Sequence, residues 1–134
     1  VERIVSELLP RADRSVRLMA LLHDASEYVV GDLISPFKAA VGLDYKAFEL
    51  RLLSAIHLRF GLPAKTPVQT ATLIKKADHI AAYFEATQLA GFEREEARKF
   101  FGTPPGILRT PRLLPLAAQE AQAQFISRFQ RLAV

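Results

Sequence analysis

Residues 18–32 read LMALLHDASEYVVGD, an apolar segment that His23 and Asp24 interrupt. Its apolar residues recur at helical spacing, which predicts a helix that begins near residues 13–15 and ends at Gly31. Glycine there tolerates the left-handed conformation that commonly terminates helices. An unpaired carboxylate is costly to bury, so Asp24 needs a basic partner, a hydrogen-bonding network with His23 or a metal ion.

Two further acids follow this pair closely in the sequence. Glu27 lies four residues after His23 and three after Asp24, so on a continuous helix it shares their face. Asp32 follows just beyond Gly31. Imidazole and carboxylates gathered in this way have two interpretations. One is a solvated face paired with Arg or Lys, and the other is a divalent-cation site with a general base beside it.

A second informative segment, ATLIKKADHIAAYFEA (71–86), places Asp78 in the middle of a long predicted helix. Asp78 lies beside the apolar stripe of that helix, where it again needs compensation, from Lys75, an arginine or a cation. Two carboxylates on separate helices that both need compensation can share one cation. The stripe consists of Leu73, Ile74, Ala77, Ile80, Ala81 and Phe84.

Helical periodicity also dominates the rest of the chain. It predicts a helix tail that Pro10 closes, and further helices over residues 44–61, 66–90 and 93–101 and from Leu113 onward. Residues 31–44 and 102–112 are rich in Gly and Pro and predict loops. No segment alternates as a strand does. We therefore expect an all-α fold of about five to six helices, in a single domain over residues 1–134.

Composition narrows the class of protein. The 134 residues include no cysteine, which excludes disulfides and thiolate metal ligands and favours a cytoplasmic location. No apolar run approaches the roughly 20 residues that span a bilayer, so no membrane partner is expected. The net charge of +4 attracts phosphate-bearing ligands, but the basic residues are scattered, which disfavours nucleic acid. The sequence leaves the oligomeric state open, and a homodimer is compatible with it.

These motifs resemble those of the HD superfamily of metal-dependent phosphohydrolases, in which a His, a His-Asp pair and a distant Asp bind a divalent metal. LLHDASEYVVGDLISPFK (21–38) is similar to the nucleotidase subgroup, which carries HDA-x-E, then GD and a Ser/Thr-Pro-x-Lys loop. YKAFE (45–49) and the K-x-A-D of residues 75–78, followed by Tyr83, also match that subgroup. The resemblance covers residues 15–90 and implies an HD-type helical bundle.

The resemblance implies roles for individual residues. His23, Asp24 and Asp78 correspond to metal ligands, and imidazole and oxygen donors suit Mn²⁺, Co²⁺, Mg²⁺, Fe²⁺ or Zn²⁺. Glu27 corresponds to the acid that activates or orients the attacking water, and Asp32 to a second acid that contacts substrate or water. The implied enzyme hydrolyses a small-molecule nucleotide or phosphate ester, namely nucleoside 5′-monophosphates with a preference for the deoxy forms.

The chain departs from the family pattern at one ligand. The family's first metal-binding His precedes the HD helix, and no His occurs before His23 here. We therefore expect that ligand upstream of Val1, in an N-terminal segment that the given sequence lacks. Lys38 and Lys75 are weaker candidates for phosphate contact, because for each of them a solvated surface lysine is the favoured interpretation.

Several alternatives stay open beside this interpretation. His57 and His79 are interpreted as core or surface residues rather than as metal ligands. A hydrolase of cyclic dinucleotides or alarmones is a related enzyme, and the cyclic-dinucleotide branch is disfavoured because its GYP signature is absent. The non-enzymatic alternatives are a non-catalytic HD module that binds a nucleotide or partner helix, and a plain helical interaction domain whose acids form salt bridges.

Overall fold

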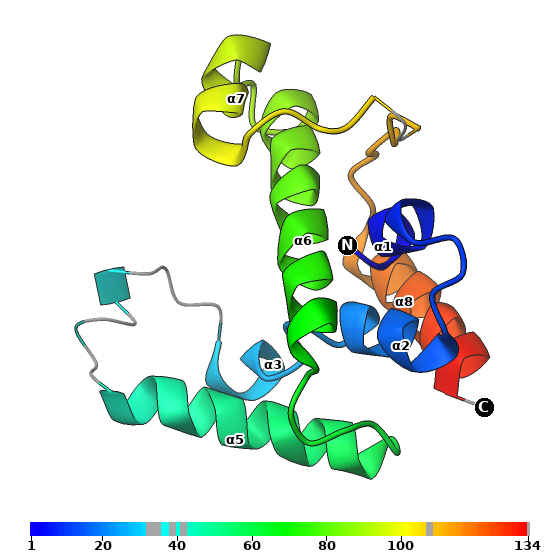
Figure 1. Ribbon diagram of the computed structural model, residues 1–134. Coiled ribbons are helices and arrows are strands. Elements are labelled where there is room, and N and C mark those ends of the chain that lie inside the picture. Colours follow the sequence, from blue (N-terminus) through cyan, green and yellow to red (C-terminus); the bar gives the residue numbers. More distant parts are fainter. Residues whose placement is uncertain (32–35, 38–39, 41–42, 107–108, 134) are drawn as a thin grey trace.

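The computed structural model describes residues 1–31, 36–37, 40, 43–106 and 109–133. The predicted all-α fold class is confirmed, because the described residues form helices, turns and loops without a strand. The helices, shown in Figure 1, are α1 (Glu2–Leu8), α2 (Arg14–Leu21), α3 (Glu27–Val30), α5 (Leu43–Arg59), α6 (Val68–Gln88), α7 (Arg94–Phe101) and α8 (Ala118–Ala133).

The long helix α6 is the centre of the fold. It packs against α1 on one side and against α7 near its C-terminal end, while α2 packs against both α1 and α8 (Figure 1). Helix α5 runs across the opposite end of α6, and α3 lies between them in this view. This arrangement brings the end of α2 next to the middle of α6, and the predicted site residues His23, Asp24 and Asp78 lie in these two regions.

Two groups of buried apolar side chains hold the helices together. The main group joins α1, α2, α6 and α8 to the segment after α5, where Leu62 is buried. The second joins α6 to α7, with Ala97 fully buried. The main group contains Val5, Leu18, Met19, Ala20, Leu22, Leu62, Ile74, Ala77 and Leu132, and the second contains Ile80, Tyr83, Phe84, Ala86 and Ala97.

The predicted helix over residues 13–30 is wrong as one continuous element. Asp13 caps its start as expected, accepting a hydrogen bond on Oδ1 from the Val16 N–H at 2.8 Å. Helix α2 then ends at Leu21, and residues 22–26 form turns before α3 begins. Short polar side chains such as Asp24 and Ser26 compete with helical hydrogen bonding and favour turns. The break lies directly at the His-Asp pair.

The C-terminal helix also begins later than the predicted start at Leu113. Helix α8 starts at Ala118, and residues 111–117 are not helical. Pro115 explains the difference, because proline disfavours the helical conformation of the residue before it and donates no backbone hydrogen bond. The predicted end of the 44–61 helix lies close to the observed end, because α5 stops at Arg59. Gly61 follows with a positive φ of 70°.

A buried acid in α1 ties three helices together, and the apolar pattern gave no sign of it. Only 4% of the Glu2 side chain is exposed. Arg128 of α8 donates from Nε to Glu2 Oε2 at 2.9 Å and from Nη2 to Oε1 at 2.8 Å. Arg17 of α2 donates to Oε1 at 3.0 Å, and so does Ser6. Such a bidentate, charge-assisted arrangement fixes the relative orientation of the helices.

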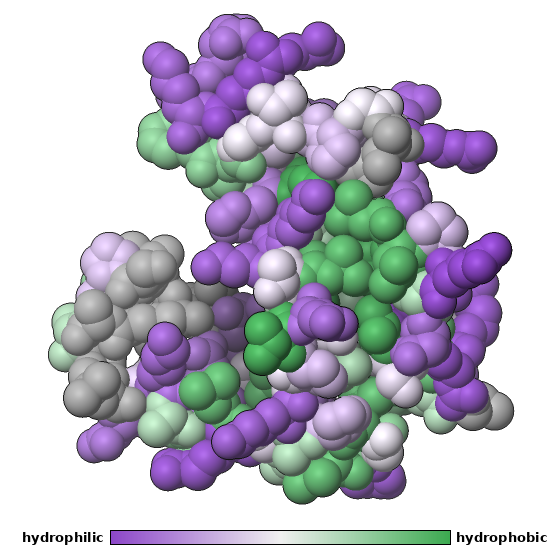
Figure 2. Space-filling model, in the orientation of Figure 1, coloured by the Kyte–Doolittle hydropathy of each residue, from purple (hydrophilic) through white to green (hydrophobic). Residues whose placement is uncertain are grey.

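The surface is mixed in character. Figure 2 shows apolar residues gathered over α6 and the α1 and α8 side of the molecule, with hydrophilic residues at the periphery. Within the described ranges, no helix combines the length and the apolar character needed to cross a membrane.

Candidate functional site

The structure brings His23, Asp24 and Asp78 together, although they come from two separate segments. His23 and Asp24 lie on the turn after α2, and Asp78 lies in the middle of α6. The His23 Nε2 atom is 2.9 Å from Asp24 Oδ2 and 3.6 Å from Asp78 Oδ1. Both carboxylates therefore approach the same ring nitrogen.

The electrostatic environment of His23 favours a positive charge. Burial alone would lower the pKa of this imidazole, but the contact with Asp24 and the charge of Asp78 outweigh burial and raise it. A raised histidine pKa means that the protein field is negative at the ring. The same field attracts a metal cation, which carries more charge than a proton.

The expectation that Asp24 is buried is wrong, and Asp78 lies beside the apolar stripe, where it is half-exposed. The exposed fraction of the side chain is 59% for Asp24 and 51% for Asp78. The break after α2 turns Asp24 outward, and Asp78 lies at the edge of the apolar stripe of α6 rather than within it. Because water solvates both carboxylates, the cost of burying a charge no longer argues for a bound cation. The argument for a cation rests instead on the convergence of the two acids on His23.

The distances around His23 can be compared with those between the ligands of a metal ion. Two ligands about 2.1 Å from one ion lie roughly 3.0–3.4 Å apart for octahedral or tetrahedral angles. The two distances from His23 Nε2 to the carboxylates, 2.9 and 3.6 Å, lie close to this range. Neither ring nitrogen of His23 makes a well-directed hydrogen bond to a described residue. However, no three described His, Asp or Glu side chains form a group that could enclose an ion.

The structure describes only one of the other two predicted acids, Glu27 and Asp32. Glu27 is the first residue of α3, and its N–H donates to the Asp24 carbonyl at 2.9 Å. Because α2 and α3 are separate helices, the argument that Glu27 shares a continuous helical face with His23 no longer applies. Asp32 and Lys38 lie outside the described residues.

A cleft of about 280 Å³ opens beside the acids, between α5 and α6. Lys75 lies three residues before Asp78 and lines this cleft with it, and it is exposed, as expected for a solvated lysine. His57 of α5 lines it too, so sequence reasoning missed this residue as a neighbour of the site. His79 is exposed and does not line the cleft. The lining residues are Met19, His23, Leu53, His57, Thr66, Ala71, Ile74, Lys75 and Asp78.

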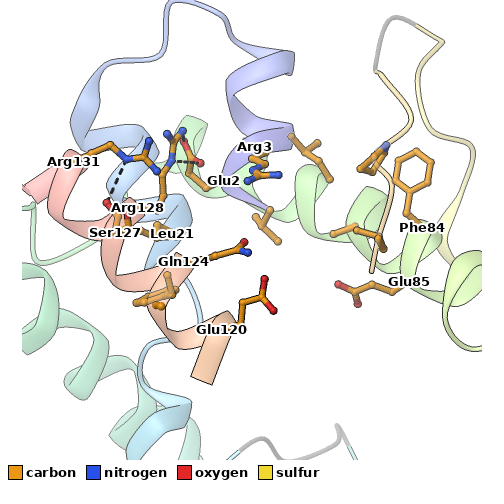
Figure 3. Close-up of a pocket in the computed structure, with 17 residues that line it drawn as sticks. Glu2, Arg3, Leu21, Phe84, Glu85, Glu120, Gln124, Ser127, Arg128 and Arg131 are labelled. Carbon is orange, nitrogen blue, oxygen red and sulfur yellow. Dashed lines mark hydrogen bonds and ion pairs between the residues drawn. The ribbon is translucent and has the colours of Figure 1, made fainter. Parts of the chain in front are cut away.

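A wider cavity of about 960 Å³ is lined by none of the predicted site residues. Figure 3 shows it with the joined Glu2 and Arg128 on one wall and Phe84 and Glu85 on the opposite wall. Val1 lines this cavity.

Comparison with known proteins finds similar sequences in two bacteria. No family model matches the chain. An uncharacterised protein of Rhodobacter capsulatus is 50% identical over 109 residues, which make up 78% of this chain and 56% of that protein. The uncharacterised protein YfdR of Escherichia coli is 31% identical over 131 residues, which make up 96% of this chain and 67% of YfdR. The chain thus spans 56% of the Rhodobacter relative's length. At this similarity and coverage, the chain belongs to the same protein family as YfdR.

Proposed function

We propose that the protein is a divalent-metal-dependent phosphohydrolase of the HD superfamily that acts on nucleoside 5′-monophosphates or a related phosphate ester. The observation that carries the proposal is the convergence of Asp24 and Asp78, from two separate segments, on the ring of His23. The motif resemblance supplies the reaction class, and the cleft lined by His23, Lys75 and Asp78 offers room for a substrate beside the acids.

In this proposal His23, Asp24 and Asp78 are the metal ligands. A divalent cation in such a site supplies Lewis acidity toward a phosphate oxygen and lowers the pKa of a bound water. The donor set of imidazole and carboxylate is compatible with Mn²⁺, Co²⁺, Mg²⁺, Fe²⁺ or Zn²⁺.

The remaining acids serve the proton transfers of hydrolysis. Glu27 accepts the proton of the attacking water, and Asp32 positions that water or protonates the departing alkoxide. Lys75 on the rim of the cleft contacts the phosphate, since an ammonium group suits a negatively charged ester. We also propose a cytoplasmic location, because a chain without cysteine needs no oxidising compartment.

Phosphate release from deoxynucleoside 5′-monophosphates tests this function. The assay uses the full-length protein with Mn²⁺ or Co²⁺ and compares the wild type with Asp78→Asn. Loss of a second-shell partner commonly costs 10- to 100-fold in activity, so loss of a direct ligand should cost at least about 100-fold. Glu85→Gln is the matched control, because Glu85 is an exposed acid on the same helix. Full activity in Asp78→Asn would remove Asp78 from the mechanism.

A non-catalytic nucleotide-binding module is the competing function. The specific observation in its favour is that the described acids are half-exposed and do not form a closed group of three ligands. This alternative predicts nucleotide binding without phosphate release and no metal in the purified full-length protein. Elemental analysis together with calorimetric titration of a nucleotide separates the two functions.

A further inference from the structure

His57 is the most deeply buried polar side chain near the proposed site. It lies in the last turn of α5, and only 1% of the residue is exposed. After Gly61, which has a positive φ, the chain turns back over the end of the helix, and the Leu62 N–H donates to the His57 carbonyl at 2.9 Å. This turn brings the Pro63 carbonyl to 3.0 Å from His57 Nδ1.

That contact determines the tautomer of the ring. A carbonyl oxygen only accepts hydrogen bonds, so Nδ1 carries the hydrogen and donates it to Pro63. In a neutral imidazole the other nitrogen, Nε2, then keeps its lone pair and acts as an acceptor. The backbone contact thus holds the ring in one orientation, with the acceptor nitrogen on the side away from Pro63.

The acceptor nitrogen has no described partner. His57 Nε2 is closed to bulk solvent and makes no hydrogen bond to a described residue. Buried acceptors are usually satisfied, because an unpaired one costs stability. His57 lines the cleft that His23, Lys75 and Asp78 also line. At about 280 Å³ the cleft is far larger than one water and close to the lower end of small-molecule pockets.

We propose that His57 is a specificity-determining residue of this cleft, whose Nε2 accepts a hydrogen bond from a hydroxyl group on the sugar of the phosphate ester. The inference rests on the proposed function and extends it to the alcohol part of the substrate. Phosphate oxygens of a dianion only accept hydrogen bonds, so an acceptor nitrogen is complementary to a hydroxyl and not to the phosphate. Because Nε2 is closed to bulk solvent, the sugar hydroxyl reaches it only after side chains that line the cleft rearrange.

Two substitutions separate the ligand-binding nitrogen from the structural one. His57→Asn keeps a donor near the position of Nδ1 for the Pro63 carbonyl and removes the Nε2 acceptor. His57→Gln removes the donor to the Pro63 carbonyl and places an amide oxygen near the position of Nε2. The ligand pair is a 2′-deoxynucleoside 5′-monophosphate and its 2′,3′-dideoxy counterpart, which lacks the sugar hydroxyls. Dissociation constants come from calorimetry in EDTA, and KM values come from phosphate release with Mn²⁺.

The wild type should bind and hydrolyse the deoxy ligand about tenfold more favourably than the dideoxy ligand, since one net hydrogen bond corresponds to roughly that factor. His57→Asn should lose this preference and His57→Gln should retain it, and both smaller side chains should lower the melting temperature because they leave space at a fully buried position. Equal handling of the two ligands by the wild type, or a preference that survives in His57→Asn, overturns the role of His57 and leaves the phosphohydrolase proposal intact. Failure of the wild type to bind or hydrolyse either ligand overturns both proposals.

Discussion

Replacing Glu2 with glutamine should destabilise the fold by about 2–3 kcal/mol at pH 7. Removing one partner of a buried ion pair commonly costs about 3–5 kcal/mol, because the remaining charge loses its compensation. The Glu2 side chain is 4% exposed, but those of Arg17 and Arg128 are 32% and 28% exposed. Water can therefore solvate the two guanidinium groups in part, which reduces the expected loss.

The effect should depend on pH in a defined direction. Burial alone would raise the pKa of Glu2, but hydrogen bonds from Arg128, Arg17 and Ser6 outweigh burial and hold the pKa below its ordinary value of 4.5. A lowered folded-state pKa stabilises the fold at pH values above 4.5, and this contribution is lost as pH falls through the folded-state pKa. The difference in the free energy of unfolding between the wild type and Glu2→Gln should therefore become smaller at acidic pH.

Urea unfolding followed by circular dichroism, at pH 7 and at successively lower pH, measures both effects. Glu7→Gln is the control on the same helix, because Glu7 is exposed and accepts a hydrogen bond from the Arg109 N–H at 3.0 Å. It should change the free energy of unfolding by less than about 0.5 kcal/mol. If Glu2→Gln were as stable as the wild type at pH 7, or if the difference were the same at acidic pH, the proposed coupling of α1, α2 and α8 through this carboxylate would be refuted.

Three further predictions concern the cap of α2, the core and the metal. Asp13→Ala should lower the free energy of unfolding by about 1 kcal/mol, because the Val16 N–H loses its acceptor; Asp13→Asn should restore most of this in the same urea titration. Met19→Ala should cost about 2–5 kcal/mol by opening a cavity next to the cleft, and equal thermal stability would contradict its place in the core. Mn²⁺ should raise the melting temperature of the full-length wild type but not that of Asp78→Asn, and EDTA should reverse the rise; an equal rise in both proteins would place the ion elsewhere.

The helices and their order could be predicted from the sequence because their causes are local. Apolar residues at helical spacing mark α1, α5, α6 and α7, and Gly61 and Gly102 adopt the positive φ values at which α5 and α7 end. The two errors of boundary also have local causes. Asp24 and Ser26 favour turns within an apolar run, and Pro115 delays the last helix.

The juxtaposition of the candidate site could be predicted only through the motifs, because spacing alone does not say which helices pack together. The burial of Asp24 was predicted wrongly, since helical periodicity assigned Asp24 to a face that the break after α2 removes. The environment of His57 depends on where residues 61–63 turn, and that of Glu2 on a helix more than 100 residues away. No local pattern in the sequence carries that information.

The ion pair between Glu2 and Arg128 also affects the order in which the polypeptide can fold. The two residues are 126 positions apart, so this contact forms only after nearly the whole described chain has been synthesised. Contacts of such long sequence separation are slow to form because a large loop must close first. Until α8 leaves the ribosome, the face of α2 that packs against α8 is exposed to water. The main core, next to which the turn with His23 and Asp24 lies, then also lacks Leu132. During translation, the most aggregation-prone interval should therefore be the one just before the C-terminal helix emerges.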